Sequence, residues 1–349
     1  MRVQYFTALF LSVAASVAAA QSRTPLPAPR ATTPASMLSS VDTTLLHGLK
    51  FRQVGPPRGG RVTTVTGVPS QPRTFYMGVA SGGLFKTTDA GTSWLPLTDG
   101  KVPVASSGAV EVAPSDPNII FYGTGSDDIR SNVSIGRGIY KSTDAGQSWT
   151  FSGLYDAGQI GAVRIHPTNP NVAWVAAIGN PFKPNTERGV FKTTDGGKNW
   201  RKVLYLSDST GAADLELNPS NPDIVYAWMW HGQRKPWTII SGAREGGFYK
   251  SIDGGEHFTK VTNGLPSDVV GKANLAVTAA NPTRVYALIE AKPGSGLYRS
   301  ENAGESWKLI STFGQLTTRP FYYVTLAVDP TNADVVYGGA ENLDRKSVV

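Results

Sequence analysis

Length, composition and charge narrow the possibilities before any motif is considered. The 349 residues include no cysteine, which excludes a disulfide framework, a thiolate nucleophile and a cysteine-based zinc site. The formal net charge is +7, but the basic residues are interleaved with acidic ones, which argues against a nucleic-acid-binding arm or a polybasic membrane patch.

Residues 1–20 have the pattern of a secretory signal peptide. Arg2 supplies a positive start, residues 5–17 are mostly apolar, and three alanines precede Gln21. The apolar run is shorter than the roughly 20 residues that a membrane-spanning helix needs, and no later segment qualifies. We expect cleavage after Ala20 and export to the periplasm or to the outside of the cell.

Residues 21–47 are rich in Pro, Ala, Ser and Thr and contain few aromatic residues. Such a composition buries too little apolar surface to order a chain, so this segment is predicted to be a disordered leader. Order is expected to begin near Phe51, and one folded domain is predicted over residues 48–343.

An eight-residue pattern, Ser/Thr-x-Asp-x-Gly-x-x-Trp, recurs five times with small variations. We call this pattern the Asp box. The copies cover residues 87–94, 142–149, 193–200, 251–258 and 300–307. This spacing is close to the roughly 40–50 residues of a propeller blade, with loops added.

A second series of motifs keeps step with the first. Turns such as Pro114 to Pro117 precede a strand-like segment six times, with small variations. In the second unit we expect strands over residues 109–113, 119–123, 138–142 and 148–151. The sequence therefore predicts an all-β fold, a β-propeller of four-stranded Asp-box blades, with six blades begun and the C-terminal blade incomplete.

Alternating segments indicate the strands nearest the propeller axis. In each, one polar residue lies between two apolar ones, which fits strands that pack between sheets and reach a central channel at intervals. The segments are Val110-Glu111-Val112, Val163-Arg164-Ile165 and Leu215-Glu216-Leu217.

The chemistry of the repeated box suggests a structural turn. A short carboxylate accepts N–H bonds within its own turn, glycine allows a positive φ, and tryptophan buries a large ring. Five equivalent turns do not share one active site, and Asn302 retains the hydrogen bonds without being a carboxylate. The residues predicted to be structural are Asp89, Trp94, Asp144, Trp149, Asp195, Trp200, Asp253, Phe258, Asn302 and Trp307.

On these boxes the chain resembles the sortilin N-terminal (VPS10-like) and BNR-repeat propellers, including exported bacterial proteins often labelled glycosyl hydrolases. The resemblance extends from Phe51 to about Asn342, and its further motifs are Gly59-Gly60-Arg61-Val62, residues 80–86, residues 187–192, Gly211-Ala212-Ala213-Asp214 and residues 319–323. It implies the fold, whereas function varies widely among such propellers, from sialidases to sorting receptors.

The meander topology separates two faces. Pro-rich turns and Asp boxes lie on one face. The loops between second and third strands lie on the other face together with the interblade loops, and we call it the loop-bearing face. Loops on a rigid scaffold often carry binding chemistry. We therefore predict ligand contacts from Asp127, Asp128, Arg130, Arg188, Trp230, His231, Arg234 and Trp237. An alternative is that Trp228 and Trp230 continue a buried strand, which leaves Trp237, after Pro236, as the better ligand candidate.

A glycosidase needs two carboxyl groups roughly 5 to 9.5 Å apart across the sugar. The acidic residues of the loop-bearing face are Asp127, Asp128, Asp156, Glu187, Asp208, Asp268 and Glu290, and no spacing selects a pair. Xyloglucan-cleaving Asp-box enzymes have an aspartate shortly before a Gly-Gly of the first blade, where this chain has Ala80. The early Phe-Arg-Ile-Pro of sialidases is matched only by Phe51-Arg52.

Neither a metal nor a cofactor is expected. The histidines, His47, His166, His231 and His257, lack metal-ligand spacing, and Gly59-Gly60-Arg61 precedes a strand rather than the helix of a dinucleotide site.

The C-terminal residues 344–349 are predicted to be a non-native tail, because they can be back-translated into a sequencing-adapter sequence that ends in a stop codon. The sixth blade would then stop after Tyr337, short of its third strand and its box. Further propeller sequence of the same chain is expected.

Together these patterns favour an exported, non-enzymatic propeller that binds a protein, peptide or glycan through its loop-bearing face. The alternative is a glycoside hydrolase, xyloglucanase-like or sialidase-like, whose full active site needs downstream sequence.

Overall fold

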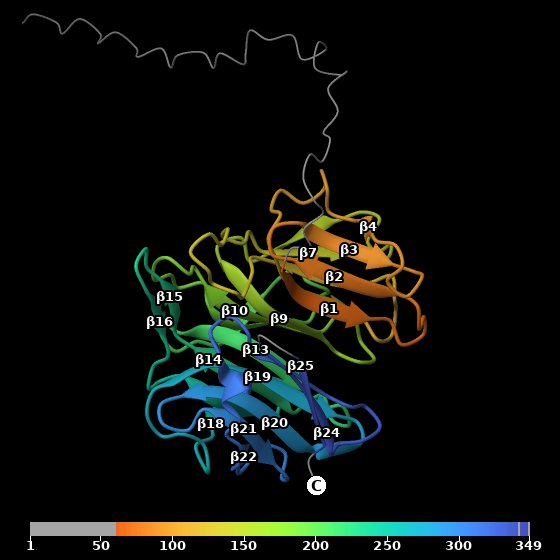
Figure 1. Cartoon of the computed structure of the whole chain (residues 1–349). Helices are drawn as coiled ribbons and strands as arrows, with labels where there is room; N and C mark the ends of the chain where they lie inside the picture. The colour runs from red at the N-terminus through yellow and green to blue at the C-terminus, as the bar shows by residue number, and fades with distance from the viewer. Residues whose placement is uncertain (1–60, 341–342, 348–349) are drawn as a thin grey trace, which may run out of the picture. The chain divides into compact units, whose positions relative to one another are not determined.

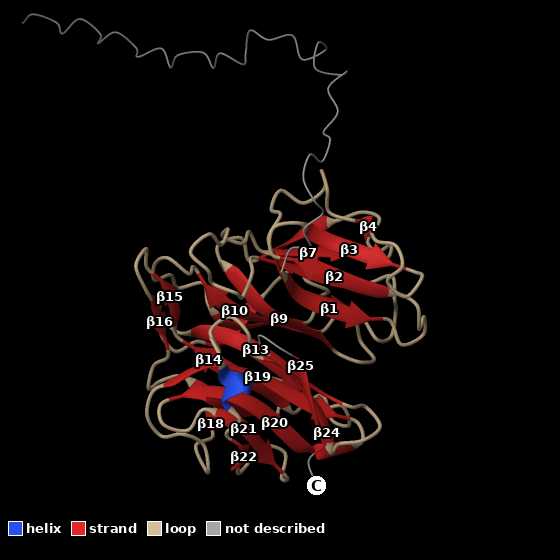
Figure 2. Ribbon diagram, in the orientation of Figure 1, coloured by secondary structure: helices blue, strands red, loops and turns tan. Residues whose placement is uncertain are grey.

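The computed structural model describes residues 61–340 and 343–347. The predicted signal peptide, the leader and Phe51 lie outside the described residues. Residues 58–349 form one compact unit, and Figures 1 and 2 show that its regular secondary structure consists almost entirely of strands, which are joined by loops. Within the described residues, no helix is long and apolar enough to cross a membrane.

The strands form successive antiparallel sheets in chain order. The first sheet contains β1 Val62–Gly67, β2 Phe75–Val79, β3 Gly83–Thr87 and β4 Leu95–Pro96. The second contains β5 Ser107–Val112, β6 Ile120–Thr124, β7 Ile139–Ser142 and β8 Thr150–Gly153. The third contains β9 Gln159–Ile165, β10 Ala173–Gly179, β11 Gly189–Thr193 and β12 Arg201–Leu204. The fourth contains β13 Gly211–Leu217, β14 Val225–Trp230, β17 Gly247–Ser251 and β18 Thr259–Lys260, with a hairpin of β15 Gly232–Arg234 and β16 Ile239–Ser241 inserted. The fifth contains β19 Val270–Thr278, β20 Asn281–Ala291, β21 Gly296–Ser300 and β22 Lys308–Ser311.

The sixth sheet contains β23 Thr325–Val328, β24 Val335–Gly339 and β25 Leu343–Ser347, and the 3₁₀ helix η3 Gly314–Thr317 precedes it. The prediction that this blade stops before a third strand is therefore wrong. Strand β25 pairs antiparallel with β24 along its whole length. An unpaired strand edge offers free backbone N–H and C=O groups, and the following segment satisfies them.

Each pair of neighbouring sheets encloses an apolar cluster. Phe121 and Val175 lie between the second and third sheets, for example, and Trp228 and Ile289 lie between the fourth and fifth. The strands nearest the axis, β1, β5, β9, β13, β19 and β23, contribute to a common central cavity. The predicted all-β propeller of four-stranded blades is confirmed.

The Asp boxes form the turns that join the third and fourth strands. In the second blade, Asp144 Oδ1 accepts bonds from Ser142 Oγ at 2.7 Å and from Ser148 N at 2.8 Å. Gly146 donates its N–H to Ser142 Oγ at 2.8 Å and has a φ of 91°. Since the Asp144 carboxylate takes the N–H of Ser148 away from strand pairing, β8 begins at Thr150 rather than at 148 as predicted.

These bonds favour the ionised carboxylate. The hydroxyl of Ser148 contributes most and its N–H comes next, and together they lower the pKa of Asp144 to about 2. In the fifth box Asn302 accepts the same bond from Ser306 N at 2.9 Å, and its amide donates to Ser306 Oγ at 2.9 Å. The turn therefore needs an oxygen acceptor rather than a charge.

The second to fifth boxes are each also held by the preceding blade, through a lysine that stands just before that blade's own box. Lys86 Nζ donates to Ala145 O of the second box at 3.3 Å, and Lys141 Nζ donates to Gly196 O of the third at 2.9 Å. Lys250 forms an ion pair with Glu305 of the fifth box.

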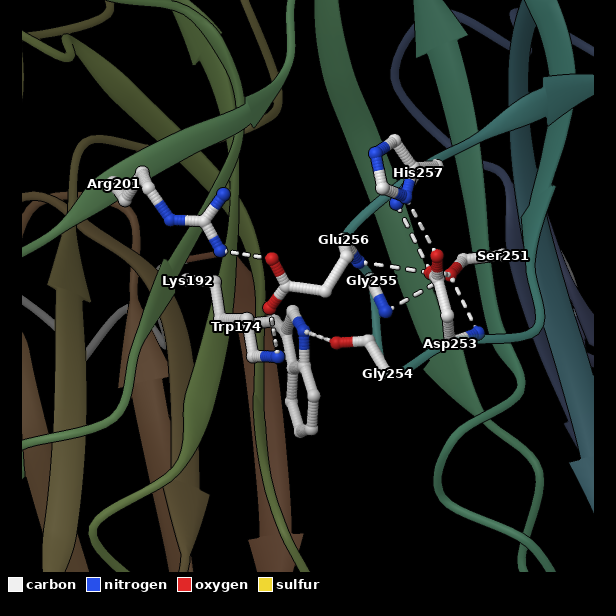
Figure 3. A network of polar contacts seen from close by, with 9 residues as sticks. All are labelled: Trp174, Lys192, Arg201, Ser251, Asp253, Gly254, Gly255, Glu256 and His257. Atoms are coloured by element: carbon white, nitrogen blue, oxygen red, sulfur yellow. Dashed lines mark hydrogen bonds and ion pairs between the residues drawn. The ribbon is translucent and has the colours of Figure 1, made fainter.

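The fourth box shows this arrangement in detail (Figure 3). Lys192 forms an ion pair with Glu256 at 2.7 Å, and Arg201 contacts the same carboxylate. Trp174, directly opposite Lys192 across the strand pair, donates its Nε1–H to Gly254 O at 3.0 Å. Lys192 Nζ lies 5.5 Å from the centre of the Trp174 ring. A basic residue and an aromatic residue of one blade thus bind the box of the next blade through an ion pair and a hydrogen bond.

The box of the second blade provides a direct test of this staple. We expect Asp144→Ala to lower the Tm by about 2–4 °C, because the Ser148 N–H and the Ser142 hydroxyl lose their acceptor. Asp144→Asn should stay close to the wild type, since the fifth box already works with an amide. Thermal unfolding followed by circular dichroism measures both shifts. Equal losses for the two variants would contradict the assignment.

Candidate functional site

The face opposite the Asp boxes carries the longer connections of the chain. They are the β6–β7 loop (residues 125–138), the β10–β11 loop (180–188), the β14–β17 segment with its hairpin (231–246) and the β22–β23 segment (312–324). All eight residues predicted to contact a ligand lie on or beside the first three of these connections. This face is the loop-bearing face.

The β6–β7 loop of the second blade crosses the end of the central channel. Asp127 Oδ2 lies 2.7 Å from Lys272 Nζ on β19, the innermost strand of the fifth blade. Ile129 is completely buried in the apolar cluster that contains Trp228 and Trp230. Contacts between residues far apart in the chain therefore anchor this loop to the fourth and fifth blades.

The charged side chains of Lys272 and Asp128, in or close to this loop, are largely buried. The side chain of Lys272 is 3% exposed. Its burial would lower its pKa, but the carboxylates of Asp127 and Asp128 outweigh that effect and raise it. Asp128 lies 3.7 Å from Arg61. Burial, together with the charge of Asp127, raises the pKa of Asp128 to about 7.

Two arginines meet on one tyrosine beside this loop. Arg234 of the β15–β16 hairpin donates from Nη1 to the hydroxyl of Tyr322 at 3.1 Å. The guanidinium of Arg130 lies 5.6 Å from the centre of the same ring. Arg130 and Arg234 are thus brought together, as the sequence prediction grouped them, whereas Tyr322 was not among the predicted ligand contacts.

The tryptophans of the fourth blade divide into two classes. Trp228 and Trp230 are completely buried, and their indole N–H groups bond to Gly271 O at 2.9 Å and to Ser241 Oγ at 3.0 Å. Trp230 was placed among the ligand contacts, but it presents no face to solvent because β14 continues through it between two sheets. Trp237, between β15 and β16, is 82% exposed.

Arg188 is a loop-stabilising residue rather than part of an open surface, and His231 lies partly buried near it. Arg188 is 2% exposed and donates to Ser209 O at 2.7 Å and to Asn185 Oδ1 at 2.7 Å, so it ties the β10–β11 loop to the next interblade loop. Burial lowers the pKa of Arg188 to about 10. Burial, and then the charge of Arg188, lowers the pKa of His231.

Exposed aromatic rings are found on several connections of the loop-bearing face. Phe182 is close to the hairpin that carries Trp237, because Arg234 N donates to Pro181 O at 2.6 Å. We call Phe182 and Trp237 the aromatic ledge. The exposed rings of this face are Tyr155 at 52%, Phe182 at 39%, Tyr205 at 41%, Trp237 at 82% and Phe313 at 46%.

The central channel contains a cavity of about 400 Å³ with charged walls. Arg164 pairs with Glu216 through two hydrogen bonds and lies 4.0 Å from Glu111. Asp214 accepts bonds from Leu275 N and Asn274 Nδ2, both at 2.6 Å. Burial raises the pKa values of Glu111 and Asp214 to about 7. The alternating segments pointed to Glu111, Arg164 and Glu216, and Asp214 ends one of the motifs of the resemblance, whereas Lys272 gave no local signal.

Most of the acidic side chains that were considered as catalytic candidates already have partners. Glu187 pairs with Lys202 at 3.2 Å and Asp268 with Arg244 at 3.1 Å. Glu290 accepts bonds from Ser241 Oγ at 2.6 Å and from Lys272 N at 3.0 Å. Over the described residues, no group of three His, Cys, Asp or Glu side chains is arranged to hold a metal ion.

No family model matches this chain. It is 25% identical over 311 residues to a xyloglucanase from Paenibacillus sp, and 24% identical over 237 residues to a probable oligoxyloglucan-reducing end-specific xyloglucanase from Neosartorya fischeri. The matches cover 88% and 64% of this chain, respectively, and 26% of each relative. The chain thus spans about a quarter of the length of these curated relatives.

Solved structures support the fold. An ancestral GH74 enzyme matches with a TM-score of 0.60 at 21% identity, over 82% of this chain and 35% of that one. A GH74 enzyme from Niastella koreensis matches with a TM-score of 0.56 at 18% identity, over 80% of this chain and 41% of that one. The predicted resemblance is confirmed at the level of a β-propeller, and its assignment to sortilin N-terminal and BNR propellers stays a prediction.

The contact between Asp127 and Lys272 can be tested through stability. We expect Lys272→Met to lower the free energy of unfolding by about 3 kcal/mol, because it leaves buried carboxyl groups without their cation. Urea unfolding measures the loss. Lys292→Met, at an exposed lysine of the same blade, is the matched control and should change little. A loss no larger than that of the control would show that the loop is not anchored across the channel.

Proposed function

We propose that this chain is the glycan-binding propeller of an exported carbohydrate-active protein, and that its loop-bearing face binds a β-glucan of the xyloglucan kind. The observation that carries the proposal is the aromatic ledge, in which Trp237 is 82% exposed on the hairpin whose Arg234 N–H bonds to Pro181, the neighbour of Phe182. An exposed indole on a rigid hairpin offers a flat apolar face against which a sugar ring stacks.

The comparisons favour a glycan over the other ligands predicted from the sequence. The two curated relatives are named for xyloglucan or its oligosaccharides. A protein or peptide ligand has no comparable support. We also propose that the protein is exported, on the basis of the predicted signal peptide. We propose membership of the sortilin N-terminal and BNR propellers on the basis of the Asp boxes.

Hydrolysis by the whole protein is the second part of the proposal. On the loop-bearing face Asp128 has the property required of a general acid, since its raised pKa keeps the carboxyl partly protonated near neutral pH. A second carboxyl group across the sugar is also required. Asp127, Glu187 and Asp268 are each committed to a cation. We therefore propose binding as the function of this chain, with hydrolysis as the second candidate.

Calorimetric titration with a xyloglucan oligosaccharide tests the proposal. We expect Trp237→Ala to weaken binding about 10- to 30-fold, the loss typical of truncating an aromatic anchor. Ile252→Ala is the matched control, because Ile252 is 72% exposed on the Asp-box face and should not contribute. An absence of binding by the wild type, or unchanged binding by Trp237→Ala, would contradict the proposal. Release of reducing sugar in the same samples would move cleavage into this chain.

A further inference from the structure

The two guanidiniums that meet on Tyr322 have no direct ionic partner among the described residues. None of the ion pairs of residues 61–340 involves Arg130 or Arg234. Within the described residues, the buried Nε–H of Arg234 also has no hydrogen-bond partner. Two cations from different blades thus contact one tyrosine, Arg130 at its ring and Arg234 at its hydroxyl.

The acidic residues nearest this position are engaged elsewhere. Asp127 is bound to Lys272 at 2.7 Å. Glu290 accepts bonds from Ser241 Oγ and from Lys272 N. Asp128 lies 3.7 Å from Arg61, and the charge of Arg130 acts on it without a direct ion pair. Among the described residues, the guanidiniums of Arg130 and Arg234 are therefore left without a carboxylate in direct contact.

The side chains at this position match one kind of anion. A guanidinium is a planar fork of N–H donors that binds a carboxylate through two parallel hydrogen bonds. Arg130 is exposed, and Arg234 lies on the hairpin that also carries Trp237. A sugar chain stacked on the aromatic ledge would pass close to these arginines.

We propose that Arg130 and Arg234 form a carboxylate subsite that binds a uronic acid residue of the glycan. This inference rests on the proposed glycan-binding function and extends it from neutral to acidic sugars. Tyr322 holds both guanidiniums in place, and the carboxylate neutralises the charge that the protein leaves unpaired.

A matched pair of tetrasaccharides isolates the carboxylate. β-1,4-linked tetraglucuronate and cellotetraose differ only at C6, where one has a carboxylate and the other a hydroxymethyl group. We expect the wild type to bind the tetraglucuronate at least tenfold more tightly in calorimetric titration at low salt. The preference should shrink as NaCl is added, because screening weakens the interaction of exposed charges.

Variants of the two arginines locate the effect. Arg130→Gln and the double variant with Arg234→Gln should lose the preference for tetraglucuronate while keeping the affinity for cellotetraose. Arg73→Gln, which removes the same charge from the Asp-box face, should keep the preference. Arg130 is exposed, so its single variant is expected to fold, and thermal unfolding checks both variants.

The outcomes separate this inference from the proposed function. Equal affinities for the two tetrasaccharides, or a preference that survives in the double variant, would overturn the carboxylate subsite and leave neutral-glycan binding intact. A failure of xyloglucan oligosaccharide and both tetrasaccharides to bind would overturn the proposed function as well.

Discussion

The structure depends on the way each blade holds the Asp-box turn of the next. A lysine before each of the first four boxes lies opposite an aromatic residue of the neighbouring strand, and the lysine reaches across to the following box. Lys192 and Trp174 together show the principle, since one supplies a charge and the other an indole N–H. Because the chain has no cysteine, its blades are held together by such contacts and by the apolar clusters between sheets.

This arrangement separates the two faces of the propeller. On the Asp-box face, the short turns are bound internally and to the neighbouring blade, so their side chains are already used. On the loop-bearing face, the connections vary in length, and they cross the channel end, form a hairpin and expose aromatic rings. The division explains why rigid architecture and ligand chemistry are found at opposite ends of the same strands.

Much of this architecture was predictable because it is local and repeated. The box pattern and its spacing indicate blades, and the order of strands and turns indicates which loops share a face. The exposure of Trp237 was predictable in the same way, since it follows Pro236 outside the strand pattern. A basic residue before each box was also visible, but its partner in the next blade was not.

Other features depend on contacts between distant segments. Asp127 meets Lys272 only because the loop of the second blade reaches the fifth. Arg188 looks like a surface residue in a loop, yet the folded loop surrounds it with carbonyl groups. Trp230 has the same residue type as Trp237 but continues a buried strand. Residue type therefore indicated aromatic and basic chemistry, whereas burial decided which side chains remain available.

Hydrogen–deuterium exchange with and without a xyloglucan oligosaccharide tests most directly whether recognition belongs to the loop-bearing face. We expect bound sugar to slow exchange in residues 180–188 and 231–242, with little change in the Asp-box turns. Protection confined to the turns at 143–149 and 252–257, or no protection anywhere at saturating sugar, would contradict it.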